Sequence, residues 1–97
     1  METYIVLVNF TQQGIAKIKE SPAWIDAARQ AVEEAGGKWL GWYLTMGRYD
    51  VVLIVQAFDS KIIASVMLAI GASGNVRTET LPAFTEEELR EMLTRLP

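Results

Sequence analysis

A glycine-containing turn between two apolar segments is the feature that most limits how this chain can fold. Residues 39–45 read WLGWYLT and residues 51–56 read VVLIVQ, and both segments are rich in aromatic and β-branched side chains. Gly47 lies between them and can adopt the positive φ that tight hairpin turns require. The sequence therefore predicts a β-hairpin at this turn.

The length of the connection decides which side chains share a face of the hairpin. A two- or four-residue connection within residues 46–49 places a wholly apolar set on one face: Leu40, Trp42, Leu44, Val51, Leu53 and Val55. The other face then carries a mixed set: Trp39, Gly41, Tyr43, Thr45, Asp50, Val52 and Ile54. A three-residue loop would reverse the assignment, because side chains alternate along a strand. We expect the apolar set to face helices, with Trp39 and Trp42 on opposite faces.

Two further segments have the character of strands. Residues 3–10 are apolar on both faces, as is the strand after the turn, so both are expected at the centre of a sheet. Residues 76–81 alternate between charged side chains and apolar or hydroxyl side chains, which suits an edge strand.

Helix signals occur between and after the strands. Thr11 is a plausible N-cap for a helix that breaks at Ser21-Pro22, and a second helix is expected from Pro22 with Ser21 as its cap. Asp59 is expected to cap a third helix. Residues 85–88 carry a hydroxyl and a carboxylate three residues apart, a capping box that opens a C-terminal helix.

The resulting order, β-α-β-β-α-β plus a terminal helix, predicts the ferredoxin-like α+β fold in one domain spanning residues 1–97. The hydrophobic fraction of 51% is high for a small soluble protein. Helices on one face leave the other face of the sheet apolar and uncovered, which indicates an interaction surface. We expect two copies to pack sheet to sheet, as a homodimer or a larger homo-oligomer of dimers.

Composition argues against several functions. The chain has no cysteine and no histidine, so it lacks a thiol nucleophile and the commonest general base and metal ligand. We expect no metal site and no cofactor. The net charge of −3, without a basic cluster, argues against direct nucleic-acid binding. No apolar run approaches membrane-spanning length and no signal peptide precedes the first strand, so we expect a cytoplasmic protein without membrane contact.

The turn also holds the candidate ligand-binding residues. Asp50 either anchors a ligand or acts as a general base in a dry pocket, or it is a carboxylate that accepts backbone N–H bonds. Arg48 could pair with a carboxylate of a ligand or of a neighbouring subunit, and Tyr49 suits packing or subunit contact. Tyr43 and Thr45 would line the same cavity as Asp50 if the predicted register holds.

Other polar residues are weaker candidates. Asn9 and Arg77 lie at strand ends, where structural roles are more common. The acidic run of residues 86–88 is explained by the cap and the helix dipole, because adjacent helical carboxylates fan around the axis and do not converge on a metal.

Several segments together resemble the GYD family, which is named after a Gly-x-Tyr-Asp motif, here Gly47, Tyr49 and Asp50. The segments that carry the resemblance cover nearly the whole chain: residues 4–11, Gly14, Ile18, Lys19, residues 21–22, 43–50, 74–80 and 83–84. The resemblance implies a dimeric α/β-barrel built from two ferredoxin-like domains, and it implies no particular activity.

A more distant resemblance is to the ligand-sensing domain of leucine-responsive (feast/famine) regulators. It rests on the Gly-x-Tyr-Asp motif before an aliphatic strand and on residues 75–80. Those domains bind amino acids or related effectors at subunit interfaces near the hairpin. The chain lacks their helix-turn-helix portion, so this resemblance implies effector binding and no direct DNA regulation.

Three functions remain open at this point. The first is a homo-oligomeric small-molecule-binding module, with its site near the Gly47-Arg48-Tyr49-Asp50 turn, either between sheet and helices or at a subunit interface. The second is a cofactor-independent enzyme of the dimeric α/β-barrel kind, monooxygenase- or isomerase-like, with Asp50 as base. The third is a scaffold oligomer, which would tolerate Asp50→Asn.

Overall fold

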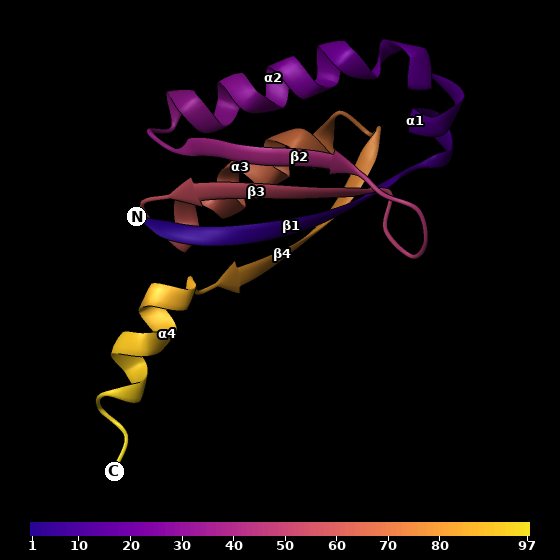
Figure 1. The fold of residues 1–97 in the computed structure, drawn as a ribbon. Helices are drawn as coiled ribbons and strands as arrows, with labels where there is room; N and C mark the ends of the chain where they lie inside the picture. Colours follow the sequence, from indigo (N-terminus) through magenta and orange to yellow (C-terminus); the bar gives the residue numbers. More distant parts are fainter.

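In the computed structural model, which describes residues 1–97, four strands form one antiparallel sheet in the order β2-β3-β1-β4 (Figure 1). The strands span Glu2–Phe10 (β1), Lys38–Leu44 (β2), Val51–Ala57 (β3) and Val76–Ala83 (β4). The two strands predicted to be central, β1 and β3, lie at the centre, and β4 lies at an edge. The predicted ferredoxin-like arrangement is confirmed.

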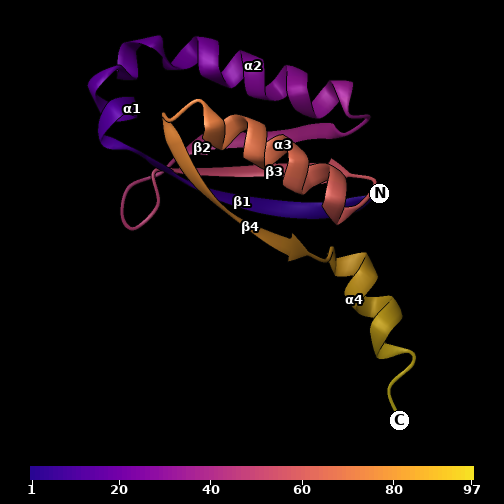
Figure 2. The ribbon, with the colours of Figure 1, turned by 180° about the vertical axis from the view of Figure 1, so that it is seen from behind.

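The helices are α1 (Gln12–Ala16), a 3₁₀ helix (Ile18–Glu20), α2 (Ser21–Glu34), α3 (Ser60–Ala72) and α4 (Glu86–Leu93). Figures 1 and 2 show α2 and α3 over one face of the sheet, which we call the covered face, whereas the other, open face carries no helix. None of the helices combines the length and the apolar composition needed to cross a membrane.

Three of the predicted caps are confirmed and one is wrong. The side chains of Thr11, Asp59 and Thr85 accept backbone N–H bonds at the starts of α1, α3 and α4, and Thr85 completes a capping box with Glu88. Ser21 is not a cap but the first residue of α2. The preceding 3₁₀ turn already gives Ser21 helical backbone angles (φ −57°, ψ −31°), whereas a cap residue needs extended ones.

The core lies between the covered face and the two long helices. Alternate residues of the central strands are buried on this side, together with one face of α3 and one residue of α2: Tyr4, Val6, Val8, Val51, Leu53, Val55, Ala57, Ile63, Val66, Met67 and Val32. Burial raises the pKa of Tyr4 to about 12, and the hydrogen bond that its hydroxyl donates to Glu2 Oε1 (2.7 Å) adds to the shift.

The hairpin register is correct at the turn and wrong further along β2. Residues 45–50 separate β2 from β3, and the hydrogen bond from Thr45 N to Asp50 O leaves four residues, 46–49, in the turn, so that Trp42 pairs with Leu53 and shares its face as predicted. A β-bulge then shifts the register between Trp39 and Gly41, so that Trp39 pairs with Val55. Leu40 is the extra residue and lies exposed. Because of this inserted residue, Trp39 and Trp42 share the covered face, which corrects the expectation that they lie on opposite faces.

A tightly packed corner joins α1 to the loop before β4. Thr11 N donates to Asn75 O (3.0 Å), Thr11 Oγ1 donates to Gly74 O (2.6 Å), and Gln13 Nε2 donates to Asn75 Oδ1 (3.0 Å). A Cβ on Gly14 would lie 2.0 Å from Asn75 O, so the contact requires glycine.

The C-terminal helix stands apart from the rest of the domain (Figures 1 and 2). It exposes an apolar stripe formed by Leu89, Met92 and Leu93, which Leu96 extends beyond the end of the helix. The projection contributes to a Cα radius of gyration of 14.7 Å. A compact chain of this length would have about 12.5 Å.

Candidate functional site

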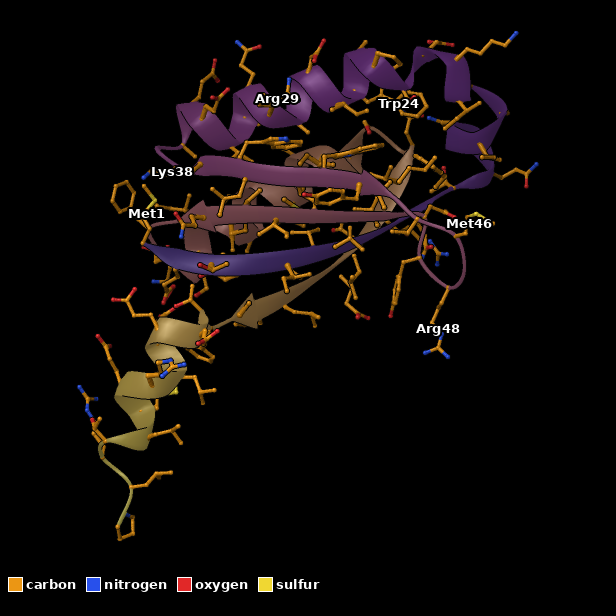
Figure 3. All side chains as sticks on the ribbon, viewed as in Figure 1. Met1, Trp24, Arg29, Lys38, Met46 and Arg48 are labelled. Atoms are coloured by element: carbon orange, nitrogen blue, oxygen red, sulfur yellow. The ribbon has the colours of Figure 1, made fainter.

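The hairpin turn is fixed by its own backbone and by one hydroxyl. Thr45 N donates to Asp50 O (2.8 Å), and Thr45 Oγ1 donates to the Tyr49 carbonyl (2.7 Å). Gly47 has φ +121°, which favours glycine. Arg48 lies at the exposed tip and points away from the body of the domain (Figure 3).

Asp50 connects the start of β3 to the end of β1. Its Oδ2 accepts a hydrogen bond from Phe10 N (2.9 Å), and its own N–H donates to Val8 O (2.9 Å). This contact corresponds to the structural role that the sequence left open for Asp50. The other carboxylate oxygen accepts no hydrogen bond from the protein, and the residue is partly exposed. One oxygen of Asp50 is therefore free to meet a ligand.

Polar side chains gather on the open face at the hairpin end of the sheet. Continuing the β1–β3 register by one step beyond Val8 and Val51 puts Asp50 opposite Asn9, and Asn9 pairs with Arg77 on β4. Tyr49 Oη donates to Glu79 Oε2 (3.3 Å), two residues further along β4. We call this group, Asn9, Tyr49, Asp50, Arg77 and Glu79, the open-face corner.

The five candidate ligand-binding residues do not all converge. Tyr49 and Asp50 lie in the open-face corner. Tyr43 pairs with Val52 and so lies on the open face, but its ring covers Gly41, where a Cβ would lie 2.9 Å from Cε2. The Thr45 hydroxyl is used inside the turn, and Arg48 points outward. Asn9 and Arg77 were weaker candidates, and Glu79 was missed because its position depends on the long-range pairing of β1 with β4.

A second feature lies on the opposite side of the sheet. A cavity of about 330 Å³, partly open to solvent, lies beside the core between the covered face and parts of α2 and α3. All three tryptophans of the chain, Trp24, Trp39 and Trp42, line it. The guanidinium of Arg29, on α2, lies over the ring of Trp39 in a cation–π contact, with Cζ 5.2 Å from the ring centroid. None of the five candidate residues lines this cavity.

The structure holds no group of three or more Asp and Glu side chains that could bind a metal ion. The open-face corner itself holds two carboxylates, one guanidinium, one phenol and one amide. Such a set can bind an ammonium group through the carboxylates and a carboxylate through the guanidinium.

Comparison with solved structures defines the class of the fold. The leucine response regulatory protein of Mycobacterium tuberculosis has a TM-score of 0.64 at 17% identity, over 87% of this chain and 51% of that one. The feast or famine regulatory protein from M. tuberculosis, complexed with L-methionine, has a TM-score of 0.65 at 16% identity, over 88% and 51%. The chain thus shares the fold of these regulators and spans about half their length.

The family follows from the sequence itself. A model of the GYD domain matches residues 4–93, and the chain belongs to this family. A relative from Thermus thermophilus, the glutamine synthetase and cystathionine beta-lyase binding protein, is 33% identical over 90 residues, which cover 92% of this chain and 95% of the relative. The crystal structure of TTHA0845, also from T. thermophilus, is 28% identical with a TM-score of 0.55, over 88% and 95%.

Proposed function

We propose that this protein is a homo-oligomeric binding module for small zwitterionic molecules of the amino-acid class. Two copies pack through the open face, and the ligand binds at the open-face corner beside the Gly47-Arg48-Tyr49-Asp50 turn. The observation that carries the proposal is a sheet face that no helix covers, apolar along its centre and charged at one end.

The centre of the open face suits a second copy. Ile5 and Leu7 of β1 lie beside Ile54 and Val52 of β3, and all four side chains remain partly exposed. Leu81 of β4 pairs with Ile5 and extends the apolar area. The same strands bury their opposite side chains fully. A twofold interface would cover this area with an identical one and would place two open-face corners along its rim.

The charges of the open-face corner define the ligand class. Asp50 and Glu79 supply acceptors for an ammonium group, and Arg77 supplies a fork of donors for a carboxylate. In this arrangement Tyr49 flanks the ligand and Thr45 holds the turn, whereas Tyr43, whose ring covers Gly41, lies outside the corner. Arg48, which points outward, reaches the partner subunit. The L-methionine that accompanies one regulator of the same fold supports an amino-acid ligand.

The geometry gives less support to the alternative enzyme, a cofactor-independent monooxygenase or isomerase with Asp50 as base. A base in that role needs a dry pocket, whereas Asp50 is partly exposed and one of its oxygens already holds Phe10 N–H. The enzyme hypothesis predicts turnover that Asp50→Asn abolishes without loss of binding.

A second candidate function is protein binding. The T. thermophilus relative is described as binding glutamine synthetase and cystathionine beta-lyase, and it matches this chain over 95% of its length. The apolar stripe of α4 is a surface on which another protein could pack. Retention of those two enzymes from the same organism on the immobilised protein, lost after Leu93→Glu, would favour this candidate.

The first experiment measures assembly and binding together. Light scattering at micromolar concentration is expected to give a dimer or a multiple of dimers, and Ile54→Lys is expected to give folded monomers. Calorimetric titration with the twenty L-amino acids is expected to find at least one ligand. For L-methionine, two analogues test the zwitterion: 3-(methylthio)propylamine, which lacks the carboxylate, and 4-(methylthio)butanoate, which lacks the amine.

Asp50→Asn is expected to lower the affinity at least tenfold, because it removes the charge and keeps an oxygen for Phe10 N–H. Glu87→Gln on α4 is the matched control, since it removes an exposed carboxylate far from the corner. A stable monomer, or no binding by any amino acid, would contradict the proposal.

A further inference from the structure

The cavity on the covered face is built from side chains of two contrasting sizes. The sheet contributes large rings, Phe10, Trp39 and Trp42, while α2 contributes Trp24 at one end (Figure 3). Along the rest of α2 the lining is mainly alanine, at positions 23, 27, 28 and 31, and α3 adds Ala69. These short side chains leave the space between helix and sheet unfilled.

No charged side chain lines the cavity. Seventeen of its twenty-one lining residues are hydrophobic, and the polar ones are Ser21, Ser73, Asn75 and Thr78. The guanidinium of Arg29 lies over Trp39 but is not part of the lining, so a charged molecule would lose its hydration here without a counter-ion in the lining, which is strongly unfavourable. The volume lies at the small end of the range for ligand pockets.

One amide in the cavity lining has a donor that is not paired within the protein and that keeps some contact with solvent. Asn75 is only 9% exposed, and its Oδ1 accepts the hydrogen bond from Gln13 Nε2. The Nδ2 of the same side chain donates to no protein group, although Asn75 lines the cavity. An acceptor on a bound molecule can take the place of solvent at this donor.

From these observations we infer that the cavity is a binding site for a small, neutral, largely apolar molecule that carries one hydrogen-bond acceptor, such as a ketone or an ether. This site lies on the other face of the sheet from the open-face corner, and it selects the opposite kind of ligand. The experiments that test this site can therefore succeed or fail whatever the outcome for the amino-acid site.

The tryptophans make the test direct, because they are the only ones in the chain and all three line the site. N-phenyl-1-naphthylamine, a neutral fluorescent probe, is expected to bind saturably at one site per chain and to quench tryptophan emission. Three naphthalenes of matched size then compete: 2-acetylnaphthalene, 2-ethylnaphthalene and 2-naphthoate. The ketone is expected to compete best, the hydrocarbon several-fold less well, and the anion at least tenfold less well than the ketone.

Two substitutions assign the binding to this cavity. Ala28→Leu fills the space from α2 and is expected to weaken probe binding at least tenfold without lowering Tm, whereas Ala64→Leu on the exposed side of α3 is the matched control. If Ala28→Leu lowers Tm, Ala31→Leu, at another half-buried position of the lining, fills the cavity instead. Asn75→Ala is expected to remove the advantage of the ketone over the hydrocarbon and to leave hydrocarbon binding intact.

Three results would overturn the inference. They are the absence of saturable probe binding, competition by 2-naphthoate equal to that by the ketone, and unchanged probe affinity in both cavity-filling variants.

Discussion

Gly14→Ala tests the packing of α1 against the loop before β4. The new methyl group would lie 2.0 Å from Asn75 O and 2.9 Å from Asn75 C, both backbone atoms that cannot rotate away. Relief requires α1 to move outward by about 1 Å or more, since a carbon–oxygen contact needs more than 3 Å. That movement stretches the hydrogen bonds from Thr11 and Gln13 to Gly74 and Asn75.

The size of the effect follows from these contacts. Three hydrogen bonds of about 1 kcal/mol each are strained or lost, and overpacking adds about 1–3 kcal/mol. The higher helix propensity of alanine returns about 1 kcal/mol. The free energy of unfolding should therefore fall by about 3–5 kcal/mol, which lowers Tm by at least about 12 °C for a domain of this size.

Urea denaturation followed by circular dichroism measures this loss, and Gly71→Ala is the matched control. Gly71 is also in a helix, α3, but a Cβ there would meet nothing within 4 Å. Its substitution should leave stability unchanged or raise it by up to about 1 kcal/mol. If both variants change stability equally, the close approach of α1 to the loop does not determine the packing at this corner, and the reasoning is wrong.

Three further predictions concern single positions. The pKa of Tyr4 is raised from 10.0 to about 12, so keeping its phenol neutral stabilises the fold fully below pH 10 and less as the pH rises towards 12; Tyr4→Phe should lose less stability than the wild type across that interval in urea titrations. Asp50→Ala leaves Phe10 N–H without an acceptor and should cost about 1–3 kcal/mol by the same assay, whereas Asp50→Asn should cost less. Deletion of Leu40 removes only the bulge residue, so it should leave tryptophan emission unchanged, whereas deletion of Tyr43 shifts a regular part of β2 and should unfold it.

Much of the fold could be predicted because each element carries its own local signal. The central strands are apolar on both faces, and the edge strand β4 alternates. The caps at Thr11, Asp59 and Thr85 each place an oxygen where the first helical N–H groups need one. Right-handed crossovers then leave few ways to arrange these elements.

The bulge at Leu40 could not be predicted from its surroundings. The segment 39–44 reads WLGWYL, with apolar residues at nearly every position, so a shift by one residue replaces one large apolar side chain with another on either face. The pairing with β3 decides the register, and it places Trp39 under Arg29. Sequence reasoning left a site between sheet and helices open, but it did not predict the tryptophan lining because it placed Trp39 and Trp42 on opposite faces.

The candidate site could be predicted only in its local part. Tyr49 and Asp50 are neighbours in the turn, and the motif marks them directly. Arg77 and Glu79 join them because of the register in which β4 pairs with β1. This register, and the contact of Tyr49 with a residue thirty positions away, cannot be read from the sequence. In the same way, the empty space beneath the alanines of α2 depends on the distance between that helix and the sheet.

The alternation of β-strands links the two proposed sites through a small number of residues. On β4, Val76 and Thr78 line the cavity while Arg77 and Glu79 belong to the open-face corner. The clearest link is Phe10, whose ring lines the cavity and whose N–H is held by Asp50 Oδ2. A ligand that draws Asp50 towards its ammonium group weakens this hydrogen bond and frees the end of β1 that supports the ring. Coupling between binding sites is reciprocal, so if an amino acid at the open-face corner changes the affinity of the cavity for a neutral molecule, that molecule must change the affinity for the amino acid by the same factor.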